Sequence, residues 1–204
     1  MKKAPSTFAL ACAMLLCAML LDGCLTMEQT LRIQDDGSIL ASYVYTYQEA
    51  NEAAIKLGLA TAVAAADMKG TPVDFLDEKG IAAFCQKNGI ELRQYRKTAK
   101  NGKCTVQIIT LVRRHSPEKL FALGGFVKED KGIKLFLPEI NWPQEVREKV
   151  ASLCPEFALS LTIVTPDKIS DTNGKLLRPD TAIWMFTPKE GLFAPPQELF
   201  VKWL

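Results

Sequence analysis

The chain has 204 residues, and its 25 lysines and arginines nearly balance its 23 aspartates and glutamates, which leaves a net charge of +2. A charge this small gives no electrostatic reason to expect nucleic acid as a partner. The single histidine, His115, follows two arginines and leaves only one candidate base for histidine-dependent catalysis. No phosphate-cradling glycine loop, zinc spacing or nucleophile elbow is present. We therefore expect a protein that is not an enzyme and that binds no cofactor and no metal.

The first 24 residues have the order of parts of an export signal. Two lysines are followed by an apolar run of 14 residues, Phe8 to Leu21, which is shorter than the roughly 20 apolar residues that span a bilayer. Leu20-Leu21-Asp22-Gly23-Cys24 resembles the lipobox of bacterial lipoproteins, in which the cysteine is diacylated and the preceding peptide is removed. The resemblance implies a signal peptide over residues 1–23 and a palmitate-type lipid anchor on Cys24.

Residues 25–47 have the pattern of a β-hairpin. Apolar and polar side chains alternate over 25–33, Asp36-Gly37 favours a tight turn, and the alternation resumes over 38–47. The return strand places three tyrosines on one face: Tyr43, Tyr45 and Tyr47. These rings have the chemistry to stack a ligand, but tyrosine is also a favoured strand residue, so ordinary sheet packing is the alternative.

Three segments have helical character. Residues 49–68 are rich in alanine and contain no proline, which predicts a helix packed on a sheet or lying against lipid. A second helix is expected from Val73 or Phe75 to Lys87, with Asn88-Gly89 as its stop. Pro143 near the first turn indicates a third helix over about 141–153.

A second hairpin is expected over residues 90–112. Its apolar residues fall on one face only if the loop has three residues, Lys100-Asn101-Gly102, with Gly102 in a left-handed bulge. The other face carries Arg93, Tyr95 and Lys97, and Arg96 adds positive charge along the same element. Arg93, Arg96 and Lys97 are assigned to a possible ligand surface. This face suits either anionic lipid headgroups or solvent.

Three cysteines would remain in the mature chain: Cys85, Cys104 and Cys154. An odd number permits at most one internal disulfide. Cys85 is expected at one end of the second hairpin and Cys104 near its tip, so a bridge between them is disfavoured. Cys154 is the better partner for either, and three unpaired core thiols are the alternative.

Later strands are expected over 133–137, 157–165, 181–187 and 199–203. The order of elements predicts an α+β fold, in which an antiparallel β-sheet carries two or three helices packed on one face. We expect a single domain over residues 24–204, with an insertion near 113–155.

The Gly23-Cys24 signal, the Asp36-Gly37 hairpin and the later Pro166, Asn173-Gly174 and Trp184 resemble the uncharacterised bacterial lipoproteins related to the mycobacterial LppM type. The segment 113–155 departs from that pattern. The resemblance implies a non-enzymatic domain of the cell envelope that contacts lipids and has no established catalytic residues. The lipobox implies that acylated Cys24 holds this domain on the membrane.

Three functions follow from these patterns. The first is a module that binds lipid, glycan or another envelope protein, the second is an assembly lipoprotein that recruits a partner chain at a sheet edge, and the third is a hydrolase with an unrecognised site. Leu25 stands where inner-membrane lipoproteins of enteric-type bacteria often carry aspartate. By that analogy we expect the outer membrane, facing the periplasm, if the organism has one.

Overall fold

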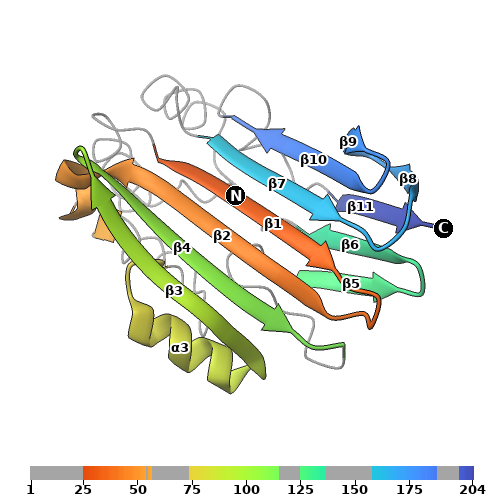
Figure 1. Cartoon of the computed structure of the whole chain (residues 1–204), viewed down its shortest axis with the longest axis horizontal. Helices are drawn as coiled ribbons and strands as arrows, with labels where there is room; N and C mark the ends of the chain where they lie inside the picture. The colour runs from red at the N-terminus through yellow and green to blue at the C-terminus, as the bar shows by residue number, and fades with distance from the viewer. Residues whose placement is uncertain (1–24, 54, 57–73, 115–124, 137–157, 188–197) are drawn as a thin grey trace, which may run out of the picture.

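The computed structural model describes residues 25–53, 55–56, 74–114, 125–136, 158–187 and 198–204, whose strands form two sheets (Figure 1). The seven-stranded sheet consists, from one edge to the other, of β3 (Ile90–Lys100), β4 (Lys103–Val112), β2 (Ile39–Gln48), β1 (Thr26–Ile33), β7 (Ala158–Val164), β10 (Thr181–Phe186) and β9 (Lys175–Arg178). Those of the four-stranded sheet are β5 (Gly125–Glu129), β6 (Gly132–Phe136), β11 (Glu198–Trp203) and β8 (Ile169–Thr172). Two helical elements have defined bounds, the 3-10 turn η1 (Glu49–Asn51) and α3 (Glu78–Lys87).

The expected α+β class is wrong, because the described part of the chain is mostly β. Strands make up 62% of it, and α3 is its single helix of the kind expected to cover a sheet. The reason lies in the second sheet, whose buried residues join those of the first in one core. A sheet that packs on another sheet needs no layer of helices to bury its apolar face. The expected helix over 141–153 and most of the one over 49–68 lie outside the described residues.

The seven-stranded sheet is mixed rather than wholly antiparallel. β1 pairs with β2 in antiparallel fashion and with β7 in parallel fashion, while all its other pairs are antiparallel. Along β2, buried and half-buried residues alternate strictly, as the sequence predicts. The strands expected near 133–137, 157–165, 181–187 and 199–203 are confirmed as β6, β7, β10 and β11.

Two predicted chain reversals are confirmed. Gly37 adopts a φ of +76° in the β1–β2 turn, and the register closes with Ile33 opposite Ile39. Gly89 follows α3 with a φ of +65°, and the Asn88 side chain donates to the Phe84 carbonyl at 2.9 Å. Both glycines occupy backbone conformations that other residues rarely adopt.

The predicted three-residue loop of the β3–β4 hairpin is wrong. Lys100 pairs with Lys103, and the turn consists of Asn101 and Gly102 alone, with φ values of 53° and 73°. These positive angles are typical of a type I′ turn. The extra residue that the apolar pattern requires lies instead within β3, where the register shifts at Arg93. Beyond this bulge, side chains that we expected on the outer face turn to the inner one.

Asn173 joins the two sheets where the chain passes from β8 to β9. Its side-chain oxygen accepts hydrogen bonds from Trp184 Nε1 of β10 at 3.2 Å and from the Phe200 backbone N–H of β11 at 3.1 Å. Its amide nitrogen donates to the Glu198 carbonyl at 2.8 Å. One side chain therefore satisfies polar groups of both sheets at their junction.

Cys85 and Cys104 are both free and buried, so the prediction that they are not bridged to each other is confirmed. Burial raises the pKa of the Cys85 thiol to about 11. Cys154 lies outside the described residues.

Candidate functional site

The three predicted tyrosines belong to the core. Tyr43, Tyr45 and Tyr47 share the inner face of β2 and are between 1% and 2% exposed. Phe75 covers two of them, because its ring stacks on Tyr45 at 4.1 Å between centroids and meets Tyr47 edge-on at 6.1 Å. In this arrangement the rings offer no open face for stacking a ligand.

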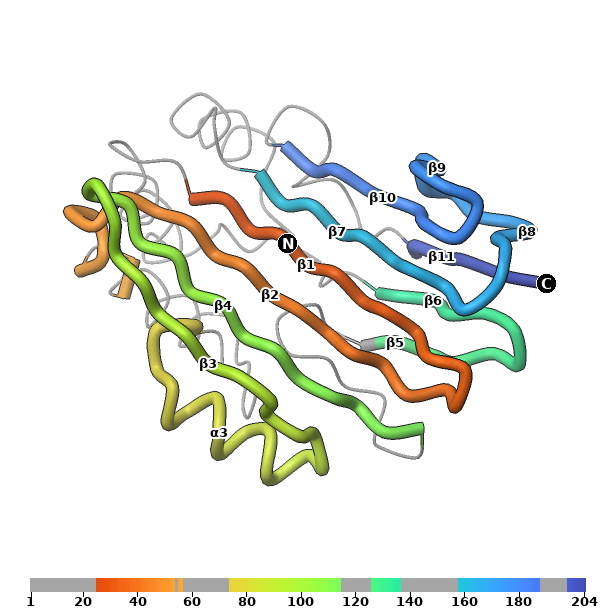
Figure 2. The backbone as a smooth tube through the Cα atoms, in the orientation of Figure 1, coloured from red at the N-terminus to blue at the C-terminus, as the bar shows by residue number. Residues whose placement is uncertain are grey.

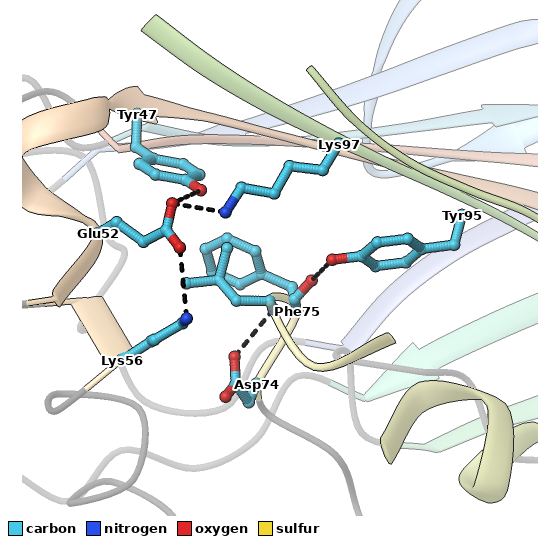
Figure 3. A network of polar contacts seen from close by, with 8 residues as sticks. Tyr47, Glu52, Lys56, Asp74, Phe75, Tyr95 and Lys97 are labelled. Carbon is cyan, nitrogen blue, oxygen red and sulfur yellow. Dashed lines mark hydrogen bonds and ion pairs between the residues drawn. The ribbon is translucent and has the colours of Figure 1, made fainter. Parts of the chain in front are cut away.

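Polar contacts hold the segment around Phe75 against the sheet (Figure 3). The Tyr95 hydroxyl on β3 donates to the Phe75 carbonyl at 3.2 Å, and the Asp74 carboxylate accepts from the Leu76 N–H at 2.8 Å. Tyr95 reaches Phe75 only because the bulge at Arg93 turns it to the inner face opposite Ile108. The predicted tyrosine face is therefore closed by a segment that the sequence did not associate with it.

Glu52 is the centre of a charged network beside Tyr47 (Figure 3). Its carboxylate accepts hydrogen bonds from Lys97 at 2.5 Å and from the Tyr47 hydroxyl at 3.1 Å, and it pairs with Lys56 at 3.3 Å. The hydrogen bond from Lys97 is the main reason that the pKa of Glu52 lies below its usual range. Lys97 is thus neutralised by a partner 45 positions away rather than free to bind a ligand.

The remaining predicted basic residues fall into two environments. Arg93, at the bulge, pairs with Glu91 at 3.1 Å, and Glu91 also pairs with Arg113 at 3.2 Å. Arg96 is exposed on the outer face opposite Gln107, and no ion pair joins it to another described residue. The six predicted residues therefore do not form one surface.

A concave site among the described residues lies at the other end of the sheet. It is a cleft of about 320 Å³ between the β1–β2 turn, the β5–β6 hairpin and the end of β11. Its apolar lining comes from Ile33, Ile39, Ile133, Pro166 and Trp203. Its charged lining comes from Asp35, Arg114, Lys128, Glu129 and Asp130. Its volume lies at the lower end of the range of small-molecule sites, and its lining carries more charged groups than is usual for them.

Lys128 fixes one wall of this cleft. Its ammonium group donates to the carbonyls of Gly37 and Arg114, each at 3.2 Å, and lies 5.6 Å from the centre of the Phe126 ring. These contacts tie β5 to the β1–β2 turn and to the end of β4. Lys128 is a charged side chain that joins the two sheets at this point. The cleft therefore has polar groups beside its apolar lining.

The β1–β2 turn that forms the opposite wall is also held by side-chain contacts. The Ser38 hydroxyl lies 2.5 Å from Gln34 Oε1 and 2.6 Å from Asp36 Oδ1, and the Ser38 N–H donates to the same Asp36 oxygen at 2.8 Å. The side-chain hydrogen bond from Ser38 is the first reason that the pKa of Asp36 lies below its usual range. The turn therefore presents a defined edge to the cleft.

The sequence did not reveal this cleft. Its lining comes from five stretches that lie between positions 33 and 203, and none of them contains a recognised motif. Asp36-Gly37 predicted the turn at its edge, but not what lies opposite. Only the packing of the two sheets brings these residues together.

The described ranges hold no group of three or more histidine, cysteine, aspartate or glutamate residues suited to a metal ion. None of their helices has the length and hydrophobicity to cross a bilayer. His115 and Cys24 lie outside these ranges.

No protein-family model matches the chain, and no curated protein matches its sequence. Among solved structures, the folded domain of LppM from Mycobacterium tuberculosis is similar at a TM-score of 0.45 and 10% identity, over 88% of this chain and 90% of that one. Yeast LTA4 hydrolase in complex with bestatin is similar at a TM-score of 0.35 and 10% identity, over 90% of this chain but 29% of the hydrolase. Neither similarity assigns a family or an activity.

Proposed function

We propose that this chain is a non-catalytic binding module of the cell envelope, anchored by acylated Cys24, that presents the cleft at the far end of its sheet to an envelope glycan. The attachment rests on the lipobox-like sequence. The observation that carries the proposal is the position of the cleft relative to the start of the fold. Leu25 is already buried and β1 begins at Thr26, so no linker separates the folded domain from the lipidation residue.

The length of β1 sets how far the cleft lies from the membrane. β1 has eight residues, and Ile33 at its end lines the cleft. At roughly 3.3 Å per residue, the strand carries the chain about 25 Å away from the anchor. A ligand in the cleft is therefore met well above the lipid headgroups, which favours a glycan or a soluble molecule over a lipid of the same bilayer.

The lining of the cleft also favours a glycan. Trp203 supplies an aromatic ring, while Asp35, Glu129 and Asp130 supply carboxylates and Arg114 supplies a guanidinium. Carboxylates accept hydrogen bonds from sugar hydroxyls, a guanidinium donates to them, and an aromatic ring packs on the apolar face of a sugar. A bilayer lipid would leave these charges poorly matched to its acyl chains.

The attachment is tested by labelling the full chain with an alkyne analogue of palmitate in a bacterium that processes lipoproteins. We expect label on the wild-type protein and none on Cys24→Ser. Cys17→Ser, which changes another cysteine of the same segment, is the matched control and should keep the label. Equal labelling of Cys24→Ser would show that acylation occurs elsewhere.

Ligand binding is tested by native mass spectrometry of the detergent-solubilised full chain mixed with oligosaccharides released from its source envelope. We expect a discrete added mass that is lost in Trp203→Ala and kept in Met185→Ala, which removes a side chain that is 63% exposed outside the cleft. An added acyl lipid, or a glycan that binds both variants equally, would refute the assignment of the site.

Recruitment of a partner chain at a sheet edge is the second candidate, and β9 favours it. This short edge strand exposes two neighbouring leucines, Leu176 and Leu177, at 52% and 54%. An exposed apolar edge invites pairing with another strand. A photo-crosslinking residue at position 177 that captures one defined envelope protein would support this role over the glycan module.

A further inference from the structure

We propose that the tip of the β3–β4 hairpin is a second membrane-binding element, whose Arg96, Lys100 and Lys103 dock on anionic lipid headgroups. The inference rests on the anchoring at Cys24 proposed above and adds the surface by which the domain lies on the bilayer. The partner is the anionic surface of the membrane that holds the anchor.

The register of the hairpin places these three cations on one face. Lys100 pairs with Lys103, and Arg96 pairs with Gln107 four positions further along β4. Val106 and Ile108 are fully buried on the inner face of β4. Because successive side chains of a strand point to opposite faces, Lys103, Thr105 and Gln107 point to the outer face. All three basic side chains are exposed there. The two-residue turn between them is tied to η1, because the Glu49 N–H donates to the Gly102 carbonyl at 2.8 Å.

The same pairing places this face at the end of the sheet where the anchor begins. Thr26 of β1 lies opposite Thr46, Thr46 lies opposite Thr105, and Thr105 lies opposite Thr98 of β3. These four residues form one row across the sheet. Figure 2 shows the β3–β4 turn and the start of β1 at the same end of the molecule.

Lys100 and Lys103 lie two residues beyond this row, toward the tip. At roughly 3.3 Å per residue, the tip therefore extends about 7 Å past Thr26, in the direction from which the anchored chain enters the fold. Cys24 is adjacent to Leu25 in sequence, so its Cα lies within about 3.8 Å of that of Leu25. A domain held this closely to lipid brings the hairpin tip to the headgroups.

The basic side chains near the tip of the β3–β4 hairpin differ in whether a carboxylate neutralises them. Lys97 and Lys56 share the carboxylate of Glu52, on the inner side. In contrast, no ion pair joins Arg96, Lys100 or Lys103 to another residue of the described ranges. Glu49 contacts the turn through its backbone N–H, and the three cations leave an excess of positive charge at the tip. Unpaired cations beside a bilayer are attracted to anionic lipid within a Debye length.

The test measures how fast individual lysines react with an amine-acetylating reagent. The full acylated chain is reconstituted into vesicles of phosphatidylcholine alone or with added phosphatidylglycerol, and modified peptides are quantified by mass spectrometry. We expect Lys100 and Lys103 to react several-fold more slowly in the anionic vesicles, and the difference to disappear in high salt. Lys131, exposed in the β5–β6 turn at the other end, should react equally in both.

Three substitutions sharpen the test. Arg96→Gln should reduce the protection of Lys100 and Lys103 by about fivefold, the factor expected for one basic residue at an anionic surface. Arg178→Gln, which removes an exposed charge on β9, should leave it unchanged. Glu49→Gln should increase the protection, because it removes the neighbouring carboxylate.

Three negative outcomes are distinguishable. An acylated, vesicle-bound protein whose tip lysines react equally in both vesicle types would overturn the hairpin contact and leave the lipid anchor intact. An intact mass without acyl chains would overturn the anchor and, with it, this inference. Equal protection of Lys131 would indicate a general effect of the anionic surface and would also overturn the contact.

Discussion

The substitution Gly174→Ala tests the junction between the two sheets. Gly174 lies between β8 of the four-stranded sheet and β9 of the seven-stranded sheet. A Cβ at this position would lie 2.6 Å from Cε2 and from Cζ2 of Trp184, much closer than the 3.5–4.0 Å or so at which carbon atoms normally pack. The Trp184 ring is only 8% exposed, so it has little room to move.

The expected cost has two parts. Accommodating the methyl group requires the ring to shift by roughly 1 Å, and overpacking of this kind costs about 1–3 kcal/mol. The shift also strains the hydrogen bond from Trp184 Nε1 to Asn173, which measures 3.2 Å and is worth about 1 kcal/mol. We therefore expect Gly174→Ala to lower the free energy of unfolding by about 2–4 kcal/mol.

Urea denaturation followed by far-ultraviolet circular dichroism measures this change, since it does not depend on the fluorescence of the tryptophan itself. The matched comparison places Gly174→Ala in a Trp184→Leu background, in which the two contacted ring atoms are gone. There the same substitution should cost less than about 1 kcal/mol, because residues in contact do not contribute additively. An equal cost in both backgrounds would refute the proposed close approach.

Three further predictions concern single side chains. The pKa of Glu52 lies below its ordinary value of 4.5. The ionised carboxylate therefore contributes fully to the stability of the fold above pH 4.5, and this contribution is lost as the pH falls through the folded-state pKa. Glu52→Gln should flatten the loss of stability in acid titrations. Cys85 and Cys104 should react with a thiol reagent far more slowly in the native protein than in urea, and two fast native thiols would contradict their burial. Gly102→Ala should lower the unfolding free energy by about 1–2 kcal/mol through backbone strain alone. The φ of Gly102 is 73°, and no atom lies within 4 Å of the added Cβ. An unchanged denaturation midpoint would contradict the positive φ at this turn.

Local sequence patterns predicted the elements whose causes are local. The alternation of 25–33 and 38–47 gave β1 and β2, and the glycines at 37 and 89 marked a turn and a helix end. In the sequence, Asn173-Gly174 and Trp184 carry only the resemblance to LppM-type lipoproteins. The structure supplies the physical reason for their spacing, because the amide and the indole meet across the junction of the two sheets.

The errors concern how elements pack. The fold class was wrong because residues 125–136, within the expected insertion, form a hairpin that helps to build a second sheet. Helix propensity and strand periodicity describe one segment at a time, and neither shows which layer covers the sheet. The signal peptide over residues 1–23, the single domain over residues 24–204 and the insertion near residues 113–155 remain predictions.

The β3–β4 hairpin separates what the sequence by itself determined from what only the tertiary structure decided. Its apolar pattern required one extra residue, and that inference was correct. The tertiary structure decided that the residue is Arg93 in mid-strand rather than part of the turn. It also set where Lys97 and Tyr95 point, and it assembled the cleft from separate stretches of chain. A periodic pattern shows how many residues of one strand face the core. The position of a bulge and the shape of a cleft depend instead on how that strand packs against segments that are distant in the sequence.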